Sequence, residues 1–135
     1  DLHHLGLMTK AFALKAFGVQ RFVGATQWDS KALYIHTRFG ALELITAYTP
    51  AHSIPETLTY AFDVTDAALL GAAGDLSHRV PLPEATMTLD AADVAGMQRI
   101  QRDIEAGARY ELLGPPAERL GQSFHALRRL DDSGV

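Results

Sequence analysis

The sequence predicts an α+β domain, with an antiparallel sheet of four or five strands and helices packed on one face. Its 135 residues, 47% hydrophobic and 21% charged, suit one globular domain. Segments that alternate apolar and polar residues indicate strands, and segments with apolar residues every three or four positions indicate helices. We therefore treat residues 1–135 as a single domain, in which residues 1–7 are expected to be a flexible or vector-derived end.

The first predicted element is a helix over residues 2–17. Apolar residues recur in it every three or four positions, which is the spacing of one helical face: Leu5, Met8, Phe12 and Ala16. Gly18 follows as a stop signal. We expect this apolar stripe to pack on the sheet.

Four strands are predicted next, at residues 19–26, 32–38, 41–48 and 58–64, from their β-branched and aromatic content. The last of them has the clearest alternation, with Leu58, Tyr60 and Phe62 on one face and Thr59 and Ala61 on the other. We expect one side of this strand to be buried.

The second half is predicted to be mainly helical. Thr65 is a candidate N-cap for a short helix over residues 65–74. After a short strand at residues 85–89, Asp90 is the expected cap of a helix that ends at Gly107. A final helix is predicted from Pro115 to Arg129, since proline is tolerated in a first turn. The expected core residues of the last two helices are Val94, Met97, Ile100 and Ile104, and Leu120, Phe124 and Leu127.

The candidate functional surface comes from the run ALYIHTRFGALELITAY, residues 32–48, interpreted as a hairpin around a two-residue turn at Phe39-Gly40. This register places His36 opposite Glu43, and gives the hairpin one aliphatic face that a helix should cover. The other face carries Tyr34, His36, Arg38, Glu43 and Ile45. A register shift of one residue would exchange the two faces.

This mixed face is the predicted binding site, because an aromatic ring, a guanidinium and a titratable His-Glu pair suit a protein partner or a planar or anionic ligand. Trp28, before the Asp29-Ser30 turn, is a further candidate residue of this binding site, since tryptophan is over-represented among interface hot spots. The competing interpretations are a partly solvated sheet face for the mixed residues, and core or rim packing for Trp28.

Composition argues against several other classes. There are no cysteines, and the net charge is −4 with basic residues scattered, so neither thiolate chemistry nor a nucleic-acid partner is expected. No apolar run has the length of a membrane span, and a cytoplasmic location is expected. The six histidines show no metal-binding spacing, and phosphate-loop and G-x-S-x-G motifs are absent, so we predict no catalytic residues, metal or cofactor.

The functional expectation is a non-catalytic regulatory or assembly domain that binds a protein partner or self-associates as a homo-oligomer. One alternative is a small-molecule-binding domain with a pocket between sheet and helices. Another is an enzyme that uses His36 and Glu43 as an acid and base.

Three runs of the sequence also suggest a family comparison. TKAFALKAFG, ALYIHTRFGALELITA and LTYAFDVTDAALLGAAGDL fall within residues 9–76, about half of the chain. In this order they resemble the helix, hairpin, strand and second helix of one repeat of the bacterial sliding-clamp fold. The resemblance implies a repeat of a ring-shaped assembly. The sequence departs from it at residues 90–107, a predicted helix where such a repeat continues with strands.

Overall fold

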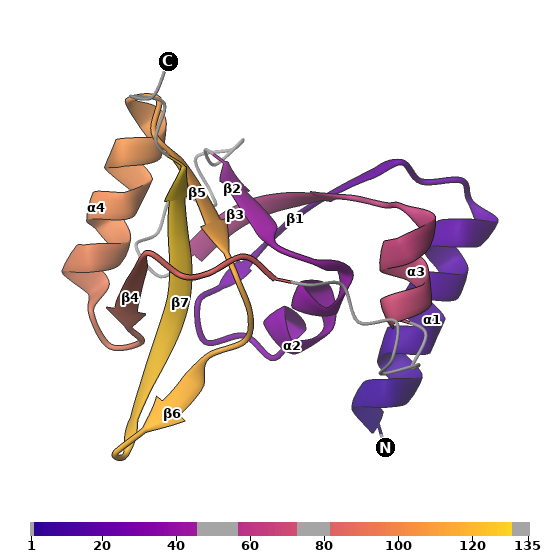
Figure 1. Cartoon of the computed structure of the whole chain (residues 1–135), viewed down its shortest axis with the longest axis horizontal. Coiled ribbons are helices and arrows are strands. Elements are labelled where there is room, and N and C mark those ends of the chain that lie inside the picture. Colours follow the sequence, from indigo (N-terminus) through magenta and orange to yellow (C-terminus); the bar gives the residue numbers. More distant parts are fainter. Residues whose placement is uncertain (1, 46–56, 73–81, 131–135) are drawn as a thin grey trace.

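The computed structural model describes residues 2–45, 57–72 and 82–130 of the chain. It is an α+β fold, as predicted, with one open antiparallel sheet of seven strands instead of four or five (Figure 1). The strands are β1 Arg21–Gln27, β2 Leu42–Ile45, β3 Thr57–Asp63, β4 Met87–Asp90, β5 Arg109–Leu112, β6 Ala117–Arg119 and β7 Gln122–Leu130. The helices are α1 Leu2–Ala16, α2 Ala32–His36, α3 Asp66–Ala72 and α4 Val94–Glu105, with a 3₁₀ turn at Thr37–Phe39.

The strand order is β1-β3-β2-β5-β7-β4, with β6 paired to β7. Directly opposed residues share a face, so the pairs Phe62–Phe22, Tyr60–Leu44 and Leu112–Leu127 lie on the same side of the sheet. Every strand residue of the hydrophobic core falls on this side: Leu42, Leu44, Leu58, Tyr60, Phe62, Leu89, Tyr110, Leu112 and Leu127. We call it the covered face and the opposite side the open face.

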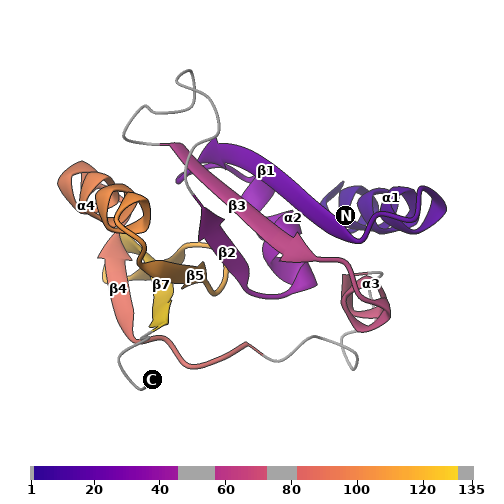
Figure 2. The ribbon, with the colours of Figure 1, turned by 90° about the horizontal axis from the view of Figure 1, so that it is seen from above.

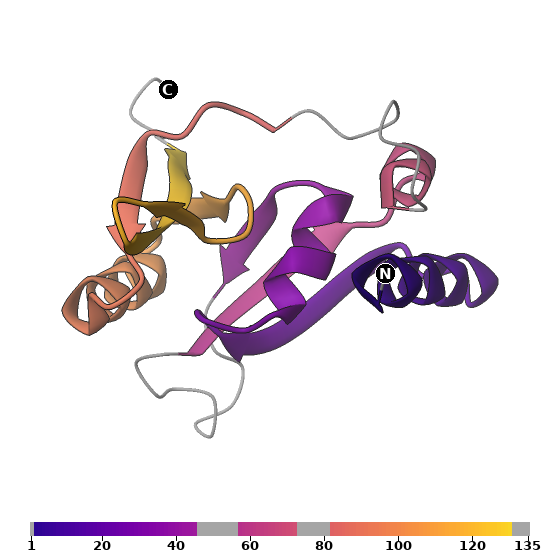
Figure 3. The same ribbon diagram turned by 90° about the horizontal axis from the view of Figure 1, so that it is seen from below.

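The four helices all contribute to this same core, as the prediction of helices on one face requires. Helix α2 supplies Leu33, and α4 supplies Met97 and Ile100. Figure 3 shows α2 across the strands β1, β3 and β2, while α4 lies beside β4 and β5 at the other end of the sheet. Helices α1 and α3 lie next to each other beyond the N-terminal end of β1 (Figure 2).

Several predicted elements are confirmed within one turn of their expected positions: α1, β1, β3, α3, β4 and α4. Thr65 caps α3, because its Oγ1 accepts a hydrogen bond of 3.0 Å from the Ala68 amide. The cap of α4 is Asp93 and not Asp90, since the Gly96 amide donates to Asp93 Oδ1 at 2.9 Å.

Burial in β3 differs from the prediction of one buried side. Thr59 is 2% exposed and Ala61 is fully buried, although both lie on the open face. The strand lies between β1 and β2, where Ala25 and Ile45 flank Thr59 and Val23 and Glu43 flank Ala61.

The predicted hairpin over residues 32–48 is wrong in its first strand, because residues 32–39 form α2 and the 3₁₀ turn. Its second strand is confirmed at β2, and residues 46–48 lie outside the described residues. The Ser30 hydroxyl accepts from the Ala32 amide at 3.1 Å, and the Thr37 hydroxyl donates to the Leu33 carbonyl one turn earlier. The buried residues Leu33, His36 and Thr37 follow the helical spacing of three and four. In a segment as short as residues 32–38, the same apolar residues fit both the alternation of a strand and the periodicity of a helix.

The predicted final helix is also wrong, since residues 117–130 form the β6–β7 hairpin. Its turn places Leu120 at φ 55° and Gly121 at φ 80°, the positive values of a two-residue hairpin loop. Leu120 is 99% exposed, and of the expected core residues only Leu127 is fully buried. Strand β7 pairs with β4 and β5 as well as with β6, and the long-range hydrogen bonds to β4 and β5 outweigh local helix preference.

Candidate interaction surface

The predicted mixed face is not formed as one surface. With α2 in place of a strand, Tyr34 lies on the helix and is 44% exposed, whereas His36 is only 8% exposed. Arg38 is half-buried in the 3₁₀ turn. Glu43 and Ile45 remain on the open face of β2. The structure therefore separates residues that the hairpin model placed together.

His36 belongs to the core on the covered face. Its Nδ1 is hydrogen-bonded to the Tyr60 hydroxyl, and its ring centroid lies 5.0 Å from that of Phe22 and 6.0 Å from that of Phe62. Burial, with a smaller effect of nearby Lys10, lowers the pKa of His36 from 6.5 to about 4. Burial also raises the pKa of Tyr60 to about 12. Both groups are thus neutral at physiological pH and act as a packed hydrogen-bonded pair.

Glu43 is engaged on the other side of the sheet. Arg21 donates from Nη2 to Glu43 Oε2 at 3.1 Å and from Nη1 to Asp63 Oδ1 at 3.0 Å. His36 and Glu43 therefore lie on opposite sides of the sheet and form no cross-strand pair. They are not placed to act together as the acid and base of the enzyme alternative. The ion pairs of Arg21 are partly exposed, so they add little stability.

Trp28 packs in the core, which favours the structural interpretation of this residue. It is 3% exposed, and its ring meets that of His125 edge-on, with centroids 5.1 Å apart. His125 is fully buried, and neither ring nitrogen has a hydrogen-bond partner among the described residues. Burial lowers the pKa of His125, while Asp29 acts in the opposite direction.

Helix α1 buries a different side from the one predicted. Ala11 and Leu14 are 6% and 5% exposed, whereas Phe12, from the stripe expected to pack, is 77% exposed, and Ala16 is exposed as well. The side chains of Leu5 and Met8, the other members of that stripe, lie outside the described part of the helix. Lys10 Nζ lies 4.6 Å from the centroid of the Phe22 ring, which helps to fix this orientation. An apolar residue therefore points outward from a helix that already has a buried side.

Phe17, directly after α1, is 84% exposed and was not identified as a candidate from the sequence. The available signal was that apolar residues occur all round this helix, which is typical of helices buried on every side. Residues 2–16 also contain no acidic residue, and Lys10 and Lys15 are their lysines. Together these features make the outward side of α1 the strongest candidate for a protein-binding surface.

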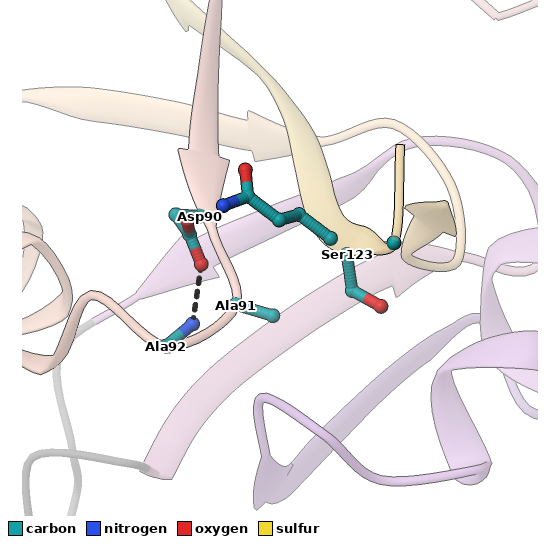
Figure 4. A pocket seen from close by; sticks show the side chains of 6 residues that line it. Asp90, Ala91, Ala92 and Ser123 are labelled. Carbon is teal, nitrogen blue, oxygen red and sulfur yellow. Dashed lines mark hydrogen bonds between the residues drawn. The ribbon is translucent and has the colours of Figure 1, made fainter. Parts of the chain in front are cut away.

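An open hollow of about 370 Å³ lies between the end of β4 and the β6–β7 turn (Figure 4). Its lining residues are Asp90, Ala91, Ala92, Gly121, Gln122 and Ser123. Asp90 Oδ1 already accepts a hydrogen bond of 2.8 Å from the Ala92 amide. The hollow is at the border of the sheet, whereas the predicted small-molecule pocket was between sheet and helices.

The described residues contain no group of three or more His, Asp or Glu side chains placed to hold a metal ion. Each helix in the described ranges is too short or too polar to cross a bilayer.

Comparison of the chain with protein-family models, with curated proteins and with solved structures gives no significant match. The resemblance to a sliding-clamp repeat depends on a hairpin over residues 32–47. That segment begins with a helix here, so the resemblance fails in its central part.

Proposed function

We propose that this protein is a non-catalytic assembly domain that binds another protein through the outward side of α1. The observation that carries the proposal is the 77% exposure of Phe12 on a helix whose opposite side, Ala11 and Leu14, is buried in the core. A large exposed aromatic side chain is typical of interface anchors, because its burial releases much ordered water with little loss of side-chain entropy.

The partner surface is expected to be apolar with acidic residues at its margin. Ala16 lies one turn after Phe12 on the same side of the helix, so the two form a small apolar surface. Lys15 lies beside them. Its Nζ pairs with Asp66 Oδ1 of α3 at 3.4 Å, yet its side chain is 72% exposed and stays accessible to a partner. No acidic residue lies on α1 itself. Complementary charge would steer the partner and fix its orientation.

Photo-crosslinking in cells that make the protein tests this proposal. Benzoylphenylalanine at position 12 should give a discrete adduct whose crosslinked peptide contains apolar residues next to Asp or Glu. The same group at position 120 is the control, because Leu120 is also exposed but lies at the tip of the β6–β7 hairpin.

A matched pair of variants tests the charge argument. In the chain labelled at position 12, Ala16→Glu should abolish the adduct through repulsion, whereas Ala16→Lys, of similar length and helix propensity, should retain it. Equal adducts from positions 12 and 120, or equal effects of Glu and Lys, would contradict the proposed surface.

A further inference from the structure

A second surface, the outer edge of β1, lacks the features that normally protect a sheet edge. Strand β1 ends the strand order, has seven residues, and carries neither charge nor proline from Phe22 to Gln27. Strand β4, at the other end, has four residues, ends in Asp90 and follows Pro83 and Glu84. Natural proteins protect exposed edges by short length, charges or prolines, since a free edge pairs with other strands. By these criteria β4 is protected and β1 is not.

The register of the sheet identifies the backbone groups that point outward from β1. The Val64 amide donates to the Gln20 carbonyl at 2.8 Å, so these two residues occupy a hydrogen-bonded position of the ladder. Such positions alternate along antiparallel strands. The backbone groups of Phe22, Gly24 and Thr26 therefore face β3, and those of Arg21, Val23, Ala25 and Gln27 face outward. Within the described ranges, no strand pairs with this outer side.

We propose that β1 pairs antiparallel with β1 of a second copy of this chain, around a two-fold axis at Gly24. In this register Val23 lies opposite Ala25 of the other copy, and Arg21 lies opposite Gln27. All four outward-facing residues then find backbone partners, and the seven-stranded sheets become one continuous sheet. This surface is separate from the outward side of α1, so the inference does not depend on the proposed function.

Side chains and charges favour a second copy as the occupant of this edge. Arg21 is the one charged residue of β1, and six residue steps separate it from its copy along the paired strands, about 20 Å. The two guanidinium groups therefore do not repel at close range. Val23 is 48% exposed on the open face, and pairing would place it beside Ala25 of the other copy. A strand that is complementary to itself in this way suits an isologous dimer.

The first test measures the mass of the full chain by sedimentation, from roughly micromolar to millimolar concentration. The wild type should dimerise, and Val23→Pro should weaken dimerisation at least about tenfold because it removes an outward amide from each copy. Val23→Thr is the matched control: it keeps the amide and β-branched shape, and should dimerise nearly as the wild type does.

A charge-complementation experiment tests the register. Because Val23 opposes Ala25, chains with Val23→Glu mixed with chains with Ala25→Lys should form heterodimers in preference to either homodimer. The double variant Val23→Glu/Ala25→Lys should recover self-association, since each Glu then faces a Lys. Mixing without preference for heterodimers would overturn the register.

Amide hydrogen exchange on the unmodified chain tests the same pairing without any substitution. In dilute solution the amides of Val23 and Ala25 should exchange fast, and that of Gly24 slowly. At high concentration all three should be protected. A chain that stays monomeric, or a dimer that survives Val23→Pro but is lost in Phe12→Ser, would overturn this inference, and the latter result would assign self-association to α1.

Discussion

Lowering the pH should destabilise the protein through the buried histidine His36. The pKa of His36 is about 4 in the folded protein, whereas the ordinary value of 6.5 approximates its pKa in the unfolded chain. Between these values the unfolded state binds the proton and the folded state does not, so stability present above pH 6.5 is lost as the pH falls towards 4. The difference of about 2.5 units between the two pKa values corresponds to a total loss of roughly 3 kcal/mol in the free energy of unfolding. About 2 kcal/mol of this is already lost at pH 5.

Urea denaturation followed by the fluorescence of Trp28 measures this effect, since Trp28 is the only tryptophan of the chain and is 3% exposed in the fold. The variant His36→Gln serves as the control, because its amide can hydrogen-bond Tyr60 without titrating. Between pH 8 and pH 5, the wild type should lose about 2 kcal/mol more than this variant. Equal losses in both proteins would refute the assignment of a strongly lowered pKa to His36.

Three further predictions concern local features of the fold. His125→Leu should leave the free energy of unfolding unchanged or raise it by up to about 1 kcal/mol. The reason is that it removes two buried ring nitrogens without hydrogen-bond partners among the described residues. A loss above about 2 kcal/mol in urea denaturation would contradict this. Asp93→Ala should cost about 1 kcal/mol by removing the cap of α4, whereas no change in the urea midpoint would argue against the cap. Leu120→Asn should raise the melting temperature measured by calorimetry, since Asn tolerates the φ of 55° better than Leu does; a lower melting temperature would count against strain at this turn.

The sequence alone determined the fold class and the elements with strong local signals. The Thr65 cap, the alternation in residues 58–63 and the apolar stripe of α4 each depend on neighbours a few residues away, so they could be identified without tertiary information. The preference for helices on one face followed from the same patterns. The hairpin over residues 32–48 failed because seven residues fit both a strand and two helical turns.

Tertiary structure decided three features that local patterns do not encode. Residues 122–130 became a strand because long-range pairing with β4 and β5 satisfies their backbone groups. Apolar residues occur on every side of helix α1, so only its contacts with α2, α3 and β1 determined that Leu14 is buried and Phe12 faces outward. Among the described strands, the unpaired outer side of β1 follows from strand order alone. Both proposed surfaces depend on which side of α1 and β1 is covered by segments distant in the sequence. Local sequence patterns do not contain this information.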